Sequence, residues 1–445
     1  MKHKSQATLF LLVAFSSSLI AASPWPQFRG PNGDGIAPAE GVPVKFGESE
    51  SLKWKTELPG RGWSSPVFDG ETLWMTTAEE RFPTEEEKTE ILKAAGEEER
   101  TFAQRQVATR IELSILAVDY ESGKLKSTVP LTSIDNPQAI HALNSFASPT
   151  PVLEGDVLFA HFGAFGTFAF DTRKKEILWQ TKIDLEHGVG PGSSPVVHGG
   201  LLVLICDGVD RQFVTALDLK TGKSVWTTDR PAMRAPKGDQ KKSYNTPIVI
   251  RDRSGREQLI CMGAQWLVSY DPATGEEIWR LDHGDGFSVV PRPIYSPKTG
   301  LIYLSTGFGK PVLLAVRPDG KGDITGSDKI AWSEAKRIPA RPSPILVGDE
   351  LYVIADGGIA SCLDATTGTL HWTERVDGNY SASPLFADGH LYFASQEGVV
   401  TVLKPGKTFE IVAQNQLEGT IMASPIAFDG SLVIRTGTAI YRFVK

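Results

Sequence analysis

Cysteine is scarce in this sequence, and its scarcity argues against several classes of protein. Only three cysteines occur in 445 residues, and no pair has the CxxC spacing of redox or metal sites. The chain also lacks a CxxCH haem-attachment pattern, a zinc pattern, a Ser–His–Asp motif and a phosphate-binding loop. Cys206, Cys261 and Cys362 each lie in an apolar, strand-like run. We therefore expect them to be small buried residues without redox or metal chemistry.

Strong net charge and long hydrophobic runs are also missing. Lys and Arg total 46 and Asp and Glu total 53, which gives a formal net charge of −7. A balance of this kind argues against a nucleic-acid partner. No segment reaches the roughly 18 consecutive apolar residues of a membrane-spanning helix. The sequence therefore predicts no transmembrane segment.

The start of the chain has the features of a signal peptide. A basic beginning precedes the short apolar run Leu9–Ile20, and small residues at 21–23 suit cleavage. We expect residues 1–22 to be removed and residues 23–445 to form the mature domain. The expected location is secreted or periplasmic.

An internal repeat is the dominant feature that the sequence does contain. One unit has small residues and a proline, two strands, a third strand ending in Asp, a Thr-Gly turn, and a strand ending in Trp. The clearest copy runs from Ser193 to Trp226. The proline recurs as Pro66, Pro149, Pro195, Pro247, Pro293, Pro344, Pro384 and Pro425, with Pro151 and Pro291 as alternatives at two places. Four short strands with turns need about 40 residues, which is the length of a propeller blade.

Two motifs of the repeat have a local physical reason. In the Asp-x-x-Thr-Gly turns at 218–222, 271–275 and 364–368, Asp caps the backbone and Gly accepts a positive φ. Tryptophan ends the fourth strand, where a large ring can fill the widening gap between the outer edges of adjacent blades. The tryptophans at this position are Trp179, Trp226, Trp279, Trp332 and Trp372. We interpret them as packing residues and not as a stacking site for a ligand.

The two ends of the chain complement each other. The last repeat, from Pro425, supplies only three strands, whereas Leu52–Thr56 has the pattern of a fourth strand with Trp54. Such a closure leaves no free sheet edge. The sequence therefore predicts an all-β fold: an eight-bladed propeller of four-stranded antiparallel blades, closed by an N-terminal strand.

The first repeat contains a charged insertion at about 78–110. Thr84 and Glu87 form a capping-box pattern, and Gly96 is a suitable stop. These features predict a helix over 84–95. Because the insertion falls between the second and third strands of its blade, we expect this helix on the channel-mouth face.

The repeat resembles the pyrroloquinoline-quinone-like propeller family. Its members include quinoprotein alcohol dehydrogenases and the non-catalytic propeller of the outer-membrane assembly machinery. The resemblance covers nearly all of 24–445. The segments at 25–31, 147–152 and 161–167 are similar to secreted bacterial propellers of this family. The resemblance implies the fold, which hosts both enzymes and scaffolds.

Polar residues are expected to ring the channel mouth. One set precedes the repeat proline and the other follows the second strand. The first set is Arg61, Asn144, Tyr244, Asn245, Arg292, Arg341 and Tyr380, and the second is His161, Asp207, Arg211, Gln265, Asp356 and Gln396. Guanidinium groups suit carboxylates and phosphates, so we predict that the four arginines converge and bind small anions weakly. The alternative is that these side chains only hydrate and bridge a polar channel.

The leading functional hypothesis is a non-catalytic, monomeric binding or scaffold module without a cofactor, whose partner or ligand the sequence does not name. One alternative is a quinone-dependent dehydrogenase. The family resemblance implies for it a Ca²⁺ held by a Glu–Asn–Asp set, an aspartate base and often an adjacent cysteine pair. The sequence has no adjacent cysteines, and Asp207 and Asp356 are the only carboxylates among the mouth candidates. The other alternative is a polysaccharide hydrolase or lyase, which needs paired carboxylates in one pocket.

Overall fold

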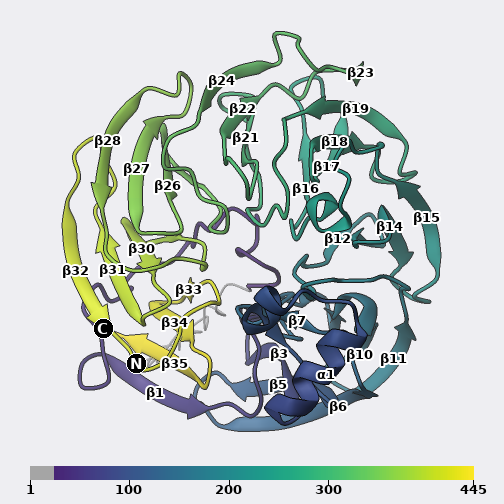
Figure 1. Ribbon diagram of the computed structural model, residues 1–445. Helices are drawn as coiled ribbons and strands as arrows, with labels where there is room; N and C mark the ends of the chain where they lie inside the picture. Colours follow the sequence, from purple (N-terminus) through teal and green to yellow (C-terminus); the bar gives the residue numbers. More distant parts are fainter. Residues whose placement is uncertain (1–24) are drawn as a thin grey trace, which may run out of the picture.

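The computed structural model describes residues 25–445, so the predicted signal peptide lies outside the described residues. The chain forms a closed ring of eight antiparallel four-stranded blades around a central channel (Figure 1). The prediction of an all-β, eight-bladed propeller is therefore confirmed. In each blade the first strand is short and innermost, and the fourth strand forms the outer edge.

The blades follow the chain in order. Blades one to four contain β2 (Val67–Phe68), β3 (Thr72–Arg81), β5 (Arg110–Asp119) and β6 (Leu125–Asp135); β8 (Val152–Glu154), β9 (Val157–His161), β10 (Thr167–Asp171) and β11 (Glu176–Thr181); β12 (Val196–His198), β13 (Leu201–Asp207), β14 (Gln212–Asp218) and β15 (Ser224–Asp229); and β16 (Ile248–Arg251), β17 (Glu257–Met262), β18 (Trp266–Tyr270) and β19 (Glu277–Asp282). The short strand β23 (Gly322–Asp323) adds in parallel to the outer edge of β19.

The remaining blades repeat the pattern. Blades five to eight contain β20 (Ile294–Ser296), β21 (Leu301–Ser305), β22 (Leu313–Val316) and β24 (Ile330–Glu334); β25 (Ile345–Val347), β26 (Glu350–Ile354), β27 (Ile359–Asp364) and β28 (Leu370–Arg375); β29 (Leu385–Ala387), β30 (His390–Ala394), β31 (Val399–Leu403) and β32 (Ile411–Gln416); and β33 (Ile426–Phe428), β34 (Ser431–Arg435), β35 (Ala439–Val444) and β1 (Leu52–Glu57). The strand β1 pairs antiparallel with β35, which confirms closure of the ring by the N-terminal strand.

Pairing within the second blade decides between its two candidate prolines. The strand β8 begins at Val152, which lies opposite Phe159 of β9. The proline that starts this blade is therefore Pro151, and the choice of Pro149 was wrong. Two prolines separated by one residue give the same local pattern, so only the pairing of strands distinguishes them. In blade five, Pro293 directly precedes β20, as expected.

The outer edges of adjacent blades are joined by the repeat tryptophans. Trp226 of blade three lies beneath Gly275 of blade four: a Cβ on Gly275 would be 2.4 Å from its Cε3 atom. The indole N–H donates to the Pro272 carbonyl at 3.3 Å, and the Thr228 hydroxyl donates to the Gly275 carbonyl at 2.8 Å. The same contact joins Trp54 to Gly123, Trp179 to Gly222 and Trp332 to Gly368. The ring fills the space that glycine leaves, so the two repeat motifs form one inter-blade contact.

Trp279 departs from this pattern. Its side chain is fully buried, and its indole N–H donates to Gln258 of its own blade at 2.7 Å. In blade five the connection from β22 to β24 is a longer loop that carries β23, and nothing lies within 4 Å of a Cβ built on its Gly326. Trp279 therefore has no turn of the usual kind on which to pack.

The insertion in blade one contains the predicted helix. α1 (Glu85–Ala94) begins at Thr84, whose hydroxyl accepts the N–H of Glu87 while the Glu87 carboxylate accepts the N–H of Thr84. A 3-10 turn, η1 (Glu99–Gln104), and the two-residue strand β4 (Arg105–Gln106) follow. The insertion is shorter than the expected 78–110, because β3 and β5 pair as far as Arg81 and Arg110.

The insertion lies on the expected face. The strand β4 pairs with β7 (Ile140–His141), which belongs to the connection between blades one and two at the channel mouth. The helix covers this side of the ring in Figure 1. Two further 3-10 turns, η2 (Gly163–Phe165) and η3 (Gly238–Lys241), lie in connections of blades two and four.

A segment before β1 crosses the other end of the channel. Trp25 exchanges backbone hydrogen bonds with Phe68, the Leu153 N–H donates to the Pro26 carbonyl at 2.8 Å, and the Ala37 N–H donates to the Phe386 carbonyl at 2.8 Å. Because these partners lie on the innermost strands of blades one, two and seven, residues 25–37 form a plug across the channel, visible as the purple trace behind the ring centre (Figure 1). The sequence did not predict this plug.

Replacing Trp226 with alanine is expected to lower the free energy of unfolding by roughly 3–5 kcal/mol, because a buried ring and its inter-blade contact are lost. Urea or thermal unfolding of the purified protein measures this change. Val225→Ala, on the same strand but 54% exposed, is the control and should change stability by less than about 0.5 kcal/mol. Equal free energies of unfolding for wild type, Trp226→Ala and Val225→Ala would contradict a packing role for Trp226.

Gly275→Ala tests the other half of the contact. Gly275 has φ of +73° and Gly255 has φ of +89°, but nothing lies within 4 Å of a Cβ built on Gly255. Both substitutions cost about 1–2 kcal/mol through the left-handed backbone. We expect Gly275→Ala to cost about 1–3 kcal/mol more than Gly255→Ala, because the added methyl group collides with Trp226. Equal melting temperatures for the two variants would refute the contact.

Candidate binding site at the channel mouth

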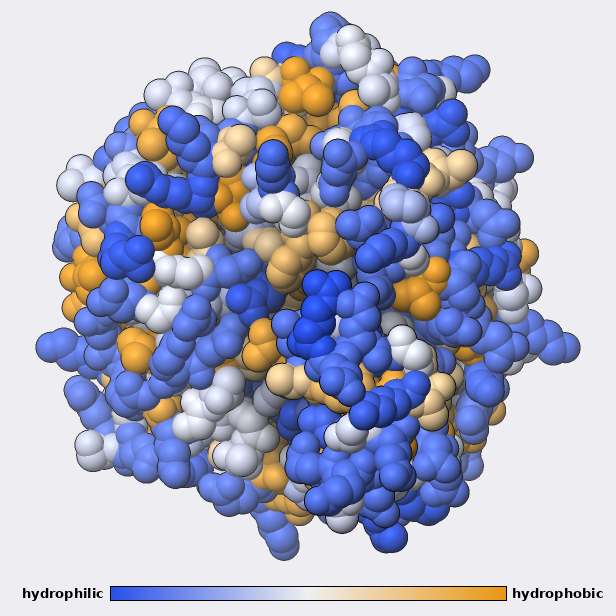
Figure 2. All heavy atoms as spheres, viewed as in Figure 1, coloured by the Kyte–Doolittle hydropathy of each residue, from blue (hydrophilic) through white to orange (hydrophobic). Residues whose placement is uncertain are grey.

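A cavity of about 500 Å³ lies at the mouth of the channel. Its wall combines apolar side chains, a set of hydroxyl groups and a few other polar groups. The lining residues are Phe28, Trp63, Leu143, Val189, Pro191, Gly192, Phe287, Val290, Phe308 and Met422; Ser65, Ser148, Thr150, Ser194, Thr246, Ser288, Ser343, Ser381, Ser383 and Ser424; and His141, Asn144, Tyr244 and Arg341. Near the centre of this face, light-orange, mildly hydrophobic residues lie beside strongly hydrophilic ones (Figure 2).

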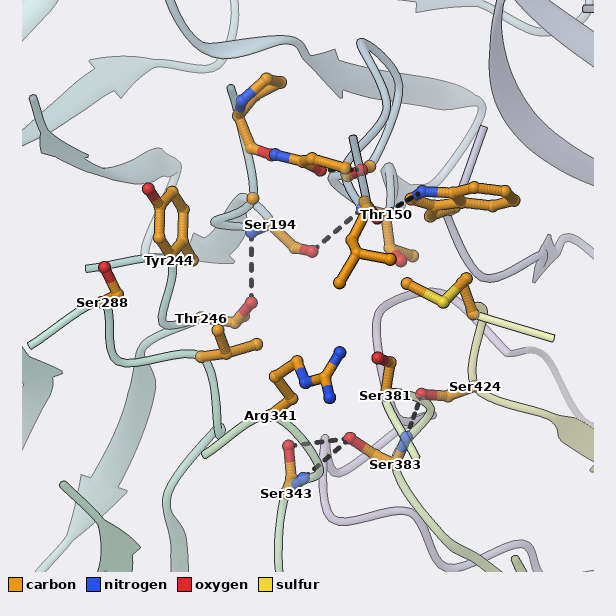
Figure 3. Close-up of a pocket in the computed structure, with 18 of the residues that line it drawn as sticks. Thr150, Ser194, Tyr244, Thr246, Ser288, Arg341, Ser343, Ser381, Ser383 and Ser424 are labelled. Atoms are coloured by element: carbon orange, nitrogen blue, oxygen red, sulfur yellow. Dashed lines mark hydrogen bonds between the residues drawn. The ribbon is translucent and has the colours of Figure 1, made fainter. Parts of the chain in front are cut away.

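Seven of the hydroxyl groups form a ring around the channel. Each belongs to the residue directly before a blade-starting proline, and each is buried. In this hydroxyl ring the backbone N–H of one blade donates to the side-chain oxygen of the next. The bonds run from Ser65 to Thr150 (2.9 Å), Thr150 to Ser194 (3.0 Å), Ser194 to Thr246 (3.1 Å), Ser343 to Ser383 (3.0 Å), Ser383 to Ser424 (2.9 Å) and Ser424 to Ser65 (3.1 Å). Figure 3 shows several of these bonds.

Arg292 interrupts the hydroxyl ring at blade five. Its N–H donates to the Ser343 hydroxyl at 3.0 Å, but it offers no side-chain oxygen to Thr246. The guanidinium group leaves the cavity and donates to the carbonyls of Phe28 at 2.6 Å and Pro247 at 3.2 Å. Burial lowers the pKa of this guanidinium to about 9. Arg292 therefore fastens the plug to the blades, and Phe28 of the plug reaches the cavity wall.

Arg341 is the one predicted arginine that lines the cavity. Its side chain extends into the space enclosed by the hydroxyl ring (Figure 3). The Nε atom lies 3.5 Å from Oδ1 of Asp356, whose carboxylate also accepts the N–H of Arg341 at 3.0 Å. Burial raises the pKa of the Asp356 carboxyl, and Arg341 acts in the opposite direction. The two Nη groups form no hydrogen bond with any described residue and are free for a ligand.

The predicted convergence of four arginines is wrong. Arg61 donates to the Asn144 carbonyl and pairs with Glu80 (Nε–Oε1 3.5 Å), and Arg211 pairs with Asp229 on the surface (2.8 Å). Together with the buried Arg292, they leave only Arg341 facing the cavity. A position in the repeat fixes where a Cα atom lies, but each long side chain turns toward the nearest acceptor.

The other predicted residues divide into three groups. Asn144 and Tyr244 line the cavity. His161 and Asp207 lie with Tyr244 around a second space of about 20 Å³, large enough for about one water molecule. The remaining four make internal hydrogen bonds: Asn245 to the Pro291 carbonyl, Gln265 from the Arg234 N–H, Tyr380 to the Asp377 carbonyl and Gln396 to the Ser381 hydroxyl.

His161 and Asp207 have structural partners. The His161 ring hydrogen-bonds Thr167 at 2.8 Å, and burial lowers its pKa to about 4. Asp207 forms two hydrogen bonds of 3.1 Å with Arg230, and both side chains are almost fully buried. The repeat pattern alone did not predict the hydroxyl ring or the position of His141 in the cavity wall. The recurring Ser/Thr-Pro pair was visible, but it is also an ordinary start of a strand.

The wall does not fit a calcium–quinone site of the kind that the resemblance implied. Ca²⁺ takes six to eight oxygen ligands, usually including several carboxylates. No Asp, Glu or Cys lines this cavity. Within residues 25–445 no group of three His, Cys, Asp or Glu side chains is arranged to hold a metal ion. The wall offers hydroxyl donors, one guanidinium group and apolar surface.

The fold and the cavity define a class of protein: an eight-bladed propeller with a binding cavity at the mouth of its channel. A family model described as outer membrane protein assembly factor BamB matches residues 44–228 and 263–408. The chain belongs to this family of pyrroloquinoline-quinone-like β-propellers.

The curated relatives that the chain matches include quinone-dependent alcohol dehydrogenases. The chain is 27% identical over 257 residues to a 1-butanol dehydrogenase (quinone) of Thauera butanivorans, covering 54% of this chain and 37% of that protein. It is 23% identical to a quinohemoprotein alcohol dehydrogenase of Pseudomonas putida, covering 39% of this chain and 29% of that protein. The chain thus matches well under half the length of these curated relatives.

Solved structures agree on the fold. BamB from Moraxella catarrhalis matches with a TM-score of 0.58 and 11% identity, covering 88% of this chain and 97% of that chain. A europium-containing methanol dehydrogenase matches with a TM-score of 0.53 and 12% identity, covering 95% and 98%. Identities this low support the architecture alone. From Trp25 to Lys445, no helix is long and apolar enough to cross a membrane.

Lys242 beside the cavity makes stability depend on pH. It is 1% exposed, its Nζ atom has no hydrogen-bond partner in the described structure, and burial lowers its pKa from 10.5 to about 7. Between these values the unfolded chain binds one more proton than the folded protein. The free energy of unfolding should therefore rise with pH, by about 1.4 kcal/mol per unit across this window.

Replacing Lys242 with methionine should remove this rise and increase stability at pH 7. Urea unfolding at several pH values between 7 and 10 measures the effect. Lys237→Met, at an exposed site, is the matched control and should keep the rise. Parallel profiles for wild type and Lys242→Met would contradict the prediction.

Proposed function

We propose that this protein is a non-catalytic binding module whose channel-mouth cavity takes a small organic anion with an apolar body. The cavity chemistry carries the proposal: an apolar wall surrounds one inward-pointing guanidinium, and no carboxylate lines the wall. Its volume lies within the roughly 300–1,000 Å³ of small-molecule sites. An anion would complete the hydrogen bonding of the Arg341 Nη groups and balance their charge.

The composition of the wall argues against catalysis. Its titratable side chains are His141, Tyr244 and Arg341. Burial lowers the pKa of His141, and its Nδ1 atom accepts the Leu143 N–H at 3.1 Å. Hydrolysis of polysaccharides would require paired carboxylates, which this wall lacks. The names of the curated relatives favour quinone-dependent oxidation, but the described wall of this cavity has none of the carboxylates that the family resemblance implies for calcium and the base.

The scaffold part of the proposal concerns the rest of the surface. A propeller presents a broad rim of loops on which a partner protein can bind, and the similarity to BamB supports such a use. We also propose that the protein is secreted or periplasmic after removal of residues 1–22. N-terminal sequencing of the exported protein tests this location.

Binding of the fluorescent anion 8-anilinonaphthalene-1-sulfonate provides the central test. We expect saturable binding at one site, weakened about tenfold by Arg341→Gln, which corresponds to the roughly 1.5 kcal/mol of one charge-assisted hydrogen bond. Arg341→Lys, which keeps the charge next to Asp356, should weaken binding less.

Arg211→Gln is the matched control, because Arg211 pairs with Asp229 on the surface. It should bind the dye like wild type. Absent binding, or equal binding by Arg341→Gln and Arg211→Gln, would refute the proposed site. Turnover of alcohols by protein loaded with quinone and Ca²⁺ would refute the non-catalytic assignment.

A further inference from the structure

The hydroxyl ring contains donors that the fold leaves unused. Every ring oxygen accepts a backbone N–H, so one lone pair of each is occupied. The Ser383 hydroxyl also donates to Ser343 at 2.9 Å. The other six hydroxyl protons have no acceptor among the described residues. A serine or threonine hydroxyl carries one proton in addition to its lone pairs, so each remains a free donor.

These donors are buried and face one space. Exposure of the ring residues ranges from 1% at Ser343 to 7% at Ser424. All seven line the cavity and come from seven of the eight blades, so their oxygens surround the channel axis (Figure 3). A buried donor without an acceptor costs about 1–3 kcal/mol. A group with several acceptor oxygens on the axis would satisfy several donors at once.

The charge of the wall restricts that group. Arg341 supplies one positive charge, and Asp356, 3.5 Å from its Nε atom, offsets part of it. A monoanion matches this balance, whereas a dianion would lose more hydration than one guanidinium returns. A cation finds hydroxyl oxygens at the ring, but the wall has no carboxylate to balance its charge, and Arg341 repels it. The ring and Arg341 together therefore favour a single carboxylate.

The apolar part of the wall gives the direction of the ligand. Leu143 and Phe308 line the cavity and are 52% and 37% exposed, so they mark its outer rim. Phe28 of the plug, held by Arg292, lies on the side of the innermost strands. A ligand that enters from the mouth therefore places one end at the hydroxyl ring. Its other end contacts Trp63 and Phe308.

We propose that the hydroxyl ring is a head-group site that binds the carboxylate of an amphipathic monocarboxylate on the channel axis. The carboxylate oxygens accept hydrogen bonds from ring hydroxyls and from the Arg341 Nη groups. The aromatic or aliphatic body packs against the rim. This inference rests on the proposed function and specifies its ligand class.

A matched ligand pair tests the head group. 4-Phenylbutyrate and its neutral amide have nearly the same shape, and both are measured by calorimetry or by displacement of the dye. We expect the acid to bind at least tenfold more tightly than the amide to wild-type protein. Sulfate and phosphate should displace the dye less effectively than 4-phenylbutyrate, and butyrate should bind weakly because it lacks the aromatic body.

Ring variants locate the head group. Thr150→Val and Thr246→Val keep the side-chain shape and remove the hydroxyl, so they should reduce the ratio of acid to amide affinity at least threefold each. Ser64→Ala is the control: the Ser64 hydroxyl bonds Thr76 and Arg435 in the core, but Ser64 does not line the cavity. This variant should lower the melting temperature without changing the ratio.

The outcomes separate the two proposals. Equal affinity for acid and amide, or an unchanged ratio in both ring variants, overturns the head-group site while Arg341-dependent dye binding still supports the cavity. Tighter binding of sulfate or phosphate than of the acid overturns the carboxylate assignment. Failure of every probe, including the dye, overturns both proposals.

Discussion

The contact of a tryptophan with the glycine turn of the following blade joins four of the eight blade junctions, including the one that closes the ring. In each such pair the indole ring occupies the space that a side chain on the glycine would need. The tryptophan of one repeat therefore needs the glycine turn of the next repeat as its packing partner. Trp54 on β1 makes the closing contact: it lies against Gly123 of blade one and donates to the Tyr120 carbonyl at 2.9 Å. The strand that completes blade eight thus also joins blade one, through the same kind of contact that joins blades two and three, three and four, and five and six.

The inner edge of the ring is built by a second repeated contact, between backbone and hydroxyl groups. Identical repeats would give a closed ring of eight hydroxyls. Arg292 breaks the symmetry, and its guanidinium holds the plug through the Phe28 carbonyl. Arg341, two residues before Ser343 of the hydroxyl ring, is a second departure from the symmetry of the repeat. It places a positive charge in the cavity. The proposed binding site therefore depends on departures from the repeat, on a frame that the repeat itself provides.

Comparison with quinone-dependent relatives separates fold from chemistry. This chain shares the propeller fold with a methanol dehydrogenase. At identities this low, the side chains of the cavity wall can differ from those of the dehydrogenases. In this chain the wall offers hydroxyl and guanidinium donors but no carboxylate. The nearest carboxylate, Asp356, is engaged by the backbone and guanidinium of Arg341. The fold supplies the position of the cavity, and the proposed preference for anions rests on these few side chains.

The sequence by itself determined the number of blades, the closing strand, the glycine turns and the capped helix, because each depends on neighbours in the chain or on repetition. It could not choose between Pro149 and Pro151, since that choice depends on which residue lies opposite Phe159. It also placed four arginines together, whereas Arg61, Arg211 and Arg292 turn to Glu80, Asp229 and Phe28. The plug and the ring of free hydroxyls were decided by the tertiary structure alone. A long side chain follows the acceptors around it, and a Ser-Pro or Thr-Pro pair becomes part of a ring only when the blades bring seven of them to one axis.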